Sequence, residues 1–235
     1  MPKKNKEISS NDLIKVKPIT EGQKAVFETY KKGQNQFLFG CAGTGKTFVS
    51  LYLAMQDVLN LQTKYDKVIL VRSLIPTREI GFLPGDEEDK AALYQVPYQN
   101  MVKFMFEQPN EQSFNMLYDK LKNQGSLYFL STSFLRGLTF DNSIIIVDEC
   151  QNLNFHELDT ITTRVGQDSK IIYCGDFSQT DLLKQNERNG LHDFLRILEE
   201  MQEFNCVEFN IGDIVRSGFV RNYLIQKTKL GIGVE

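Results

Sequence analysis

One stretch decides the fold: a short apolar segment, Gln36–Phe39, leads into the loop Gly40-Cys41-Ala42-Gly43-Thr44-Gly45-Lys46-Thr47. The loop fits the pattern G-x-x-x-x-G-K-[ST] in full, and an amphipathic segment, Lys46–Leu59, follows it. Glycines let the backbone curl so that successive N–H groups face phosphate oxygens. The N-terminus of the following helix adds its dipole and its free donors. The sequence therefore predicts a phosphate-binding loop between a strand and a helix.

The residue types in this loop indicate a nucleotide as its ligand. Lys46 supplies a point charge to β- and γ-phosphates, and the hydroxyl of Thr47 can hold Mg²⁺. Upstream, Gln23 can give a bidentate amide contact to adenine, although an exposed glutamine on a helix explains it equally well. The predicted nucleotide-binding residues are Gln23, Gly40, Cys41, Ala42, Gly43, Thr44, Gly45, Lys46 and Thr47.

Two carboxylates follow a second apolar run, Ile144-Ile145-Ile146-Val147-Asp148-Glu149. Ligands of open α/β sheets bind at the carboxyl ends of the strands, so both acids are expected at the phosphate site. Asp148 can hold the magnesium, directly or through water. Glu149 can reach a water aligned with the γ-phosphate and act as a general base. An adjacent glutamate favours an ATPase over kinase-like and GTPase-like proteins.

A third strand with a polar end is predicted at Lys170–Cys174, followed by Gly175-Asp176-Phe177-Ser178-Gln179. The Gly-Asp pair can turn the chain at the same edge of the sheet. Gln179 then senses the γ-phosphate or orients the attacking water. This pattern is weak by itself and gains weight from its place after the two motifs above.

Apolar strand-like runs alternate with helical patterns along the chain, which predicts an α/β fold with a mostly parallel, doubly wound sheet. Continuous apolar runs indicate strands that are buried on both faces. The predicted strands are Gln36–Gly40, Lys67–Arg72, Ser126–Leu130, Ile144–Asp148, Lys170–Cys174 and Val207–Phe209. The predicted helices are Glu21–Lys32, Lys46–Leu59, Ala91–Phe106, Glu111–Asn123, Phe155–Val165, Leu191–Met201 and Arg216–Lys227.

The chain length of 235 residues suits one such domain. Residues 1–20 are polar and are expected to be a flexible N-terminal segment, with the ordered domain over 21–235. An insertion is expected at about 77–125. It would begin with a turn or hairpin at Thr77–Asp86, which holds two glycines and a proline around an apolar tip.

Composition limits the classes of partner. With 41% hydrophobic residues the chain can build its own core, and a net charge of −3 leaves room only for a local basic patch. No apolar run is long enough for a membrane helix, so no membrane contact is expected. The scattered cysteines predict reduced thiols in a cytoplasmic protein.

The motifs together resemble the PhoH-like family of predicted ATPases, which is related to the superfamily 1 helicase core. The resemblance runs from about Gln23 to about Arg221. The segments that carry it are Gln23, Gly40–Thr47, Val71–Ser73, Gly81–Gly85, Phe134–Gly137, Val147–Asn152, Gly175–Gln179 and Asp213–Arg216.

The resemblance implies a RecA-like core, ATP and Mg²⁺ as ligands, ATP hydrolysis, a link to phosphate-starvation genes, and RNA-related activity in some members. The size of the chain resembles that of short phage members. Cys41 and Cys150 stand where the family more often has proline and alanine. Neither change is expected to disturb phosphate binding, because the loop donates through its backbone.

A second RecA-like half, which gives monomeric helicases a catalytic arginine, has no room in this chain. We expect a homo-oligomeric ring, with a hexamer as the expected size, that supplies the arginine in trans. The preferred arginine is Arg216, so the predicted catalytic residues are Glu149, Gln179 and Arg216. Arg72, Arg136 and Arg221 are alternatives, and Arg72 can instead contact a nucleic-acid phosphate.

The leading functional hypothesis is an ATP-driven motor or remodeller acting on RNA or single-stranded DNA. The alternative is a nucleotide-gated oligomeric switch that hydrolyses ATP slowly and does not move along nucleic acid. A small-molecule kinase is a third possibility, and Glu149 argues against it.

Overall fold

The computed structural model describes residues 6–73, 87–132, 135, 137–176 and 185–230. The predicted hairpin at Thr77–Asp86 and two predicted site residues, Arg136 and Gln179, lie outside the described residues. Among the described helices, none combines the length and the apolar character needed to cross a membrane.

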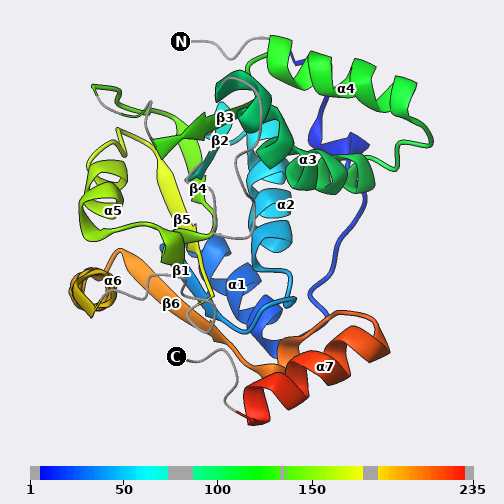
Figure 1. Ribbon diagram of the computed structural model, residues 1–235. Coiled ribbons are helices and arrows are strands. Elements are labelled where there is room, and N and C mark those ends of the chain that lie inside the picture. Colours follow the sequence, from blue (N-terminus) through cyan, green and yellow to red (C-terminus); the bar gives the residue numbers. More distant parts are fainter. Residues whose placement is uncertain (1–5, 74–86, 133–134, 136, 177–184, 231–235) are drawn as a thin grey trace.

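A six-stranded sheet forms the centre of the molecule, and every pairing between its strands is parallel (Figure 1). The spatial order of the strands is β3-β2-β4-β5-β1-β6. This is the parallel α/β sheet that the sequence predicted. The strands are β1 (Asn35–Gly40), β2 (Lys67–Arg72), β3 (Leu127–Ser131), β4 (Ser143–Val147), β5 (Lys170–Cys174) and β6 (Phe204–Phe209).

Helices cover both faces of the sheet. Helices α1 to α4 pack on one face, and α5 and α6 pack on the other (Figure 1). The α-helices are α1 (Glu21–Lys31), α2 (Lys46–Leu59), α3 (Glu87–Met105), α4 (Glu111–Asn123), α5 (Phe155–Thr162), α6 (Gln185–Glu200) and α7 (Gly218–Lys229); short 3₁₀ turns are η1 (Ser10–Asp12), η3 (Cys150–Asn152) and η5 (Ile211–Asp213).

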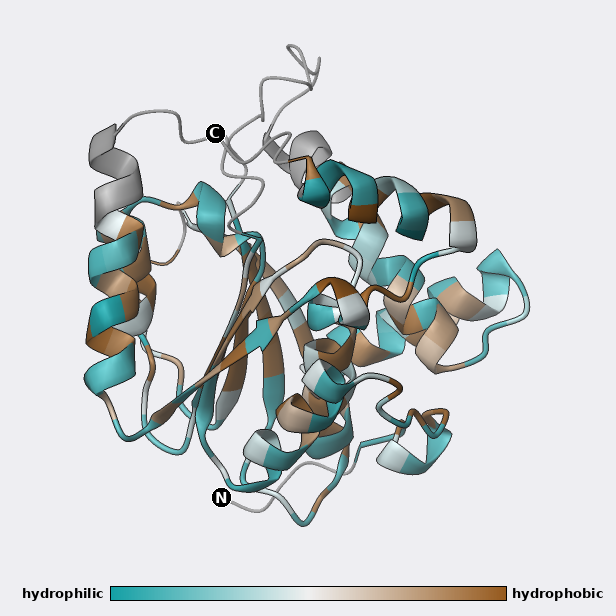
Figure 2. Cartoon of the chain, turned by 90° about the horizontal axis from the view of Figure 1, so that it is seen from below, coloured by the Kyte–Doolittle hydropathy of each residue, from teal (hydrophilic) through white to brown (hydrophobic). Residues whose placement is uncertain are grey.

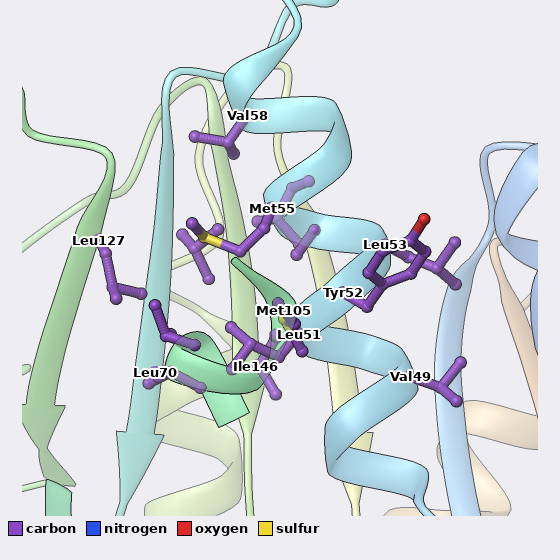
Figure 3. Close-up of a cluster of buried hydrophobic side chains, with 14 of the residues drawn as sticks. Val49, Leu51, Tyr52, Leu53, Met55, Val58, Leu70, Met105, Leu127 and Ile146 are labelled. Carbon is purple, nitrogen blue, oxygen red and sulfur yellow. The ribbon is translucent and has the colours of Figure 1, made fainter. Parts of the chain in front are cut away.

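Strand β4 shows why the fold is double-sided. Its side chains alternate between the two faces, so Ile144 and Ile146 join the core under α2 while Ile145 and Val147 join the core under α5 and α6. Met55 and Val58 point from α2 toward the strands (Figure 3). The strands are accordingly hydrophobic between the helix layers (Figure 2).

Residues 6–20, here called the N-terminal strap, differ from the expectation of a flexible segment. Ile8 and Leu13 are buried in the core beside α2. The N–H of Ile14 donates to the carbonyl of Met105 at 2.9 Å, and the N–H of Val16 donates to the hydroxyl of Tyr52 at 3.1 Å. These contacts fix the strap across α2 and the end of α3. A few apolar side chains within a polar stretch are enough to hold it there.

Candidate nucleotide-binding site

The phosphate-binding loop joins β1 to α2, and the end of β6 supports it from the side. Gly40 has φ +113°, and a Cβ atom there would stand 2.1 Å from the carbonyl oxygen of Phe209. Only glycine permits both the backbone angle and this close approach. The same carbonyl accepts the N–H of Cys41 at 2.9 Å, so Cys41 offers no free backbone donor to a phosphate.

Arg216 lies against the same loop. A Cβ atom at Gly43, which has φ +73°, would stand 2.8 Å from the Cγ atom of Arg216. The N–H of Val215 donates to the carbonyl of Gly43 at 3.0 Å, which fixes the segment on the loop. The sequence favoured a neighbouring subunit as the recipient of this arginine. In the structure Arg216 contacts the phosphate-binding loop of its own chain and lines the same cavity, and its supply in trans stays a prediction.

Lys46, the first residue of α2, is folded back onto the loop. Its ammonium donates to the carbonyls of Gly40 at 2.9 Å and Cys41 at 2.7 Å, and the residue is 8% exposed. These contacts satisfy a buried charge. A phosphate oxygen can replace these carbonyls as the acceptor of the ammonium.

Thr47 and Asp148 meet between α2 and β4. The Thr47 hydroxyl donates to Oδ1 of Asp148 at 2.7 Å, although the two residues are far apart in sequence. The pairing arises because parallel strands β1 and β4 end at the same edge of the sheet, with β5 between them. A hydroxyl beside a carboxylate fits Mg²⁺, which takes one or two protein oxygens and completes its shell with phosphate and water. The described residues hold no larger cluster of metal-binding side chains.

Glu149 follows in an unusual backbone conformation, with φ +52° and ψ +41°. This left-handed conformation is strained for a residue other than glycine, and strain of this kind is typical of functional positions. Burial raises the pKa of Glu149, and the neighbouring charge of Asp148 raises it further. A carboxylate whose pKa is raised toward neutrality is a better proton acceptor than an ordinary one.

Gln151 connects Glu149 to the end of β5. Its amide nitrogen donates to Oε2 of Glu149 at 2.5 Å, and its amide oxygen accepts the N–H of Asp176 at 3.1 Å. Gln151 is 1% exposed, so its two bonds orient the glutamate from within the core. The loop after β5 therefore contacts the predicted base through one amide.

Gln23 lies at the site, but both ends of its amide are bonded to backbone. Its nitrogen donates to the carbonyl of Thr44 at 3.0 Å, and its oxygen accepts the N–H of Ile19 at 3.0 Å. It thus joins the strap to the phosphate-binding loop. Contact with adenine uses the remaining hydrogen and lone pair and stays a prediction.

A cavity of about 980 Å³ opens over the loop. The strap, the phosphate-binding loop, α3, the β4 and β5 ends, and the segment after η5 all contribute to its wall. Of the predicted residues, its lining includes Gln23, Ala42, Gly43, Thr44, Gly45, Lys46, Thr47, Asp148, Glu149 and Arg216. The alternative Arg221 is exposed on α7 and is not among them.

Sequence reasoning missed three contributions to this site. Gln151 stands two residues after Glu149 in the sequence, and this position alone does not indicate that it binds Glu149. The strap lines the cavity with Ile14 and Lys17, among others. Tyr98 of α3 donates to Asp148. Its sequence spacing gave no signal, because a tyrosine on a helix usually belongs to the core.

Comparison with known proteins agrees with these motifs. The family model described as PhoH-like protein matches residues 15–226. The PhoH-like protein of Synechocystis sp. is 32% identical over 211 residues, covering 89% of this chain and 61% of the relative. Protein PhoH of Escherichia coli is 31% identical over 217 residues, covering 92% of this chain and 59% of the relative. The chain spans less than two thirds of the length of either relative.

Solved structures show a more remote likeness. The Pif1 helicase from Candida albicans has 15% identity and a TM-score of 0.42, covering 92% of this chain and 44% of that protein. The large terminase of a thermophilic bacteriophage, in complex with ADP, has 13% identity and a TM-score of 0.47, covering 88% of this chain and 49% of that one. Overlaps of this quality support no argument about function.

Proposed function

The chain belongs to the PhoH-like family, and from this premise we propose that it binds ATP with Mg²⁺ and hydrolyses the bond to the γ-phosphate. The observation that carries the proposal is the 2.7 Å contact between Thr47 and Asp148, with Glu149 as the next residue. A hydroxyl and a carboxylate at the end of a phosphate-binding loop are what P-loop proteins offer to Mg²⁺. The adjacent glutamate adds a base, which attack by water requires.

The loop accounts for binding in this proposal. Lys46 exchanges its carbonyl acceptors for phosphate oxygens, and the free backbone donors at the start of α2 bind the remaining charge. When bound, Mg²⁺ neutralises charge that develops on the β- and γ-phosphates. The wall formed by the strap and α3 surrounds the rest of the nucleotide.

Glu149 accepts the proton of the attacking water. Gln151 holds its carboxylate on the site, and burial keeps its pKa above the ordinary value for glutamate. Arg216 approaches the γ-phosphate from the same chain and stabilises charge that appears in the transition state. Since Glu149 acts only as the carboxylate, turnover should fall on the acid side at a pH above the ordinary pKa of glutamate.

Two variants test the proposal. Lys46→Ala should lose affinity for ATP, measured by fluorescence of a labelled nucleotide. Glu149→Gln should keep that affinity and lose about a hundredfold or more in turnover, because the amide has the same shape but no basic oxygen. Glu208→Gln, an exposed glutamate on β6, is the matched control and should turn over ATP like the wild type. Undiminished hydrolysis in Glu149→Gln would remove it as the base.

The purpose of turnover is a separate part of the proposal. We favour a motor or remodeller acting on RNA or single-stranded DNA, supported by the resemblance of the motifs to the superfamily 1 helicase core. The alternative is a nucleotide-gated switch that acts on a protein assembly. ATP hydrolysis measured at low salt with and without single-stranded RNA or DNA separates them, because stimulation favours the first and its absence favours the second.

A further inference from the structure

Helix α3 brings a tyrosine into contact with the carboxylate that faces the metal position. The hydroxyl of Tyr98 donates to Oδ2 of Asp148 at 2.7 Å. Both residues are buried, with Tyr98 2% exposed and Asp148 7% exposed. The segment that carries α3 lies between β2 and β3 in the chain, outside the three motifs that define the site.

The two oxygens of Asp148 are therefore held from opposite elements. Oδ1 accepts the hydroxyl of Thr47 from α2, and Oδ2 accepts the hydroxyl of Tyr98 from α3. A carboxylate with a donor on each oxygen cannot rotate freely about its terminal bond. Its orientation toward the metal position is consequently set by Tyr98 as well as by Thr47.

We propose that Tyr98 is a positioning residue for magnesium, which fixes the orientation of Asp148 and thereby makes the tight binding of the metal–nucleotide pair depend on α3. The inference rests on the proposed binding of ATP with Mg²⁺. Partners that orient a metal-binding side chain typically contribute about tenfold to a hundredfold in metal affinity. Tyr98 does not touch the nucleotide in this role and acts only through Asp148.

The surroundings keep Tyr98 a hydrogen-bond donor. Burial raises its pKa well above the ordinary value for tyrosine, and the charge of Asp148 raises it further. Arg72, at the end of β2, acts in the opposite direction without reversing the shift. A raised pKa favours the protonated form of Tyr98, which is the form that donates to Asp148.

The same helix provides a matched control. Tyr94 lies one turn before Tyr98, and its ring faces the guanidinium of Arg72 at 5.4 Å from the ring centroid. Its hydroxyl is buried, and within the described part of the chain it has no hydrogen-bond partner. Removal of this hydroxyl deletes the same atom from the same helix without touching Asp148.

The ring of Tyr98 has a packing role of its own, which a phenylalanine retains. It packs against Phe129 of β3 with ring centroids 5.8 Å apart. Tyr98→Phe therefore keeps this contact and removes only the hydroxyl, which donates to Asp148 and also hydrogen-bonds Arg72. Circular dichroism and the thermal midpoint without nucleotide confirm that each variant is folded before binding is compared.

The experiment measures the affinity of a fluorescent ATP analogue in EDTA and during a Mg²⁺ titration, for wild type, Tyr98→Phe and Tyr94→Phe. Tyr98→Phe should need about tenfold or more Mg²⁺ for the same gain in affinity, with the affinity in EDTA unchanged within about twofold. Tyr94→Phe should match the wild type in both. In an Asp148→Asn background, Tyr98→Phe should have no further effect on Mg²⁺ dependence, because the residue through which it acts is already changed.

The possible failures are distinct. A wild type whose nucleotide affinity does not respond to Mg²⁺ would overturn the proposed function and this inference together. A responsive wild type with an equally responsive Tyr98→Phe would overturn the role of Tyr98 alone. The same holds if Tyr98→Phe weakens binding equally with and without Mg²⁺, since that result indicates a general structural effect.

Discussion

Gly40 is the residue at which the last strand of the sheet comes closest to the phosphate-binding loop. The carbonyl of Phe209 occupies the space that any side chain would need, and it binds the next N–H of the loop. Gly33, in the turn between α1 and β1, has a similar positive φ of +83° but no atom within 4 Å of a Cβ position. A side chain at Gly33 would bear only the free-energy cost of the positive φ, whereas a side chain at Gly40 would also bear the cost of the contact with Phe209.

Alanine substitutions at these two positions should therefore differ. Gly33→Ala bears only the cost of the left-handed conformation, about 1 kcal/mol, which lowers the thermal midpoint by about 2 to 4 °C. Gly40→Ala must also displace β6 and should cost several times more, with loss of nucleotide affinity. Differential scanning calorimetry of both variants checks this, and equal midpoints would show that β6 yields easily at Phe209.

At the scale of elements, the turn η5 joins the start of α1 to the end of β6. Asp213 accepts the N–H of Gly22 and the N–H of Asn210, each at 2.9 Å. Burial acts to raise the pKa of Asp213, but these donors outweigh it and the pKa is lowered. A carboxylate with a lowered pKa stabilises the fold above its ordinary pKa and loses that contribution as the pH falls through the folded value.

Asp213→Asn should remove this acid-sensitive contribution. Near neutral pH the loss should be about 2 kcal/mol, typical of hydrogen bonds to a charged acceptor. The difference between wild type and variant should shrink as the pH falls below the ordinary pKa of aspartate and through the lowered folded pKa of Asp213, because the wild-type carboxylate then becomes protonated. Urea denaturation across this range measures the difference. A constant gap at all pH values would mean that the charge of Asp213 contributes nothing.

The bounds of the helices and strands show which elements can be predicted from the sequence alone. The bounds of α2, β2, α4 and β5 agree with the sequence prediction, because each has a clear apolar period between turn residues. Strand β6 begins at Phe204 rather than Val207, since an edge strand alternates apolar and polar side chains and its first half reads as a loop. The sequence predicts α5 at Phe155–Val165 and α7 at Arg216–Lys227, whereas α5 ends at Thr162 and α7 spans Gly218–Lys229. The ends differ because polar residues in the terminal turns show little hydrophobic periodicity.

The site residues likewise fall into those that a local motif predicts and those that only the packing places. Lys46, Thr47, Asp148 and Glu149 were predictable because each belongs to a local motif, and the carboxyl ends of parallel strands bring such motifs together. Tyr98 and the N-terminal strap were not, because their contacts depend on where α3 and the strap cross the sheet. That crossing is a property of packing and leaves no pattern in the local sequence.

At the scale of the whole molecule, the position of Arg216 bears on the oligomer. The chain places this arginine against its own phosphate-binding loop, and we propose that it acts in cis. The homo-oligomeric ring stays a prediction, and its size is open to a mass measurement of the purified protein with ATP. If Arg216 acts on the site of its own chain, mixtures of inactive variants should behave differently from mixtures in which it acts in trans.

A mixture of Arg216→Ala and Lys46→Ala should show no recovery of ATP hydrolysis. Each chain would lack either the arginine or the lysine that its own site requires. Arg216→Ala alone should bind ATP yet lose about a thousandfold in turnover, whereas Arg221→Ala, on the exposed side of α7, should behave as wild type. A phosphate-release assay measures hydrolysis in the mixture. Recovery of hydrolysis in mixed oligomers would show that Arg216 acts on the site of a neighbouring subunit.

The support that β6 and η5 give to the loop has a consequence for synthesis. The ribosome releases β1 and α2 early, while the carbonyl of Phe209 and the N–H of Val215, which hold Gly40 to Gly43 in shape, emerge only after the other strands. A nascent chain can assemble the inner sheet before its phosphate-binding loop is braced. The two backbone contacts that hold the loop at Cys41 and Gly43 can therefore form only after Phe209 and Val215 have left the ribosome.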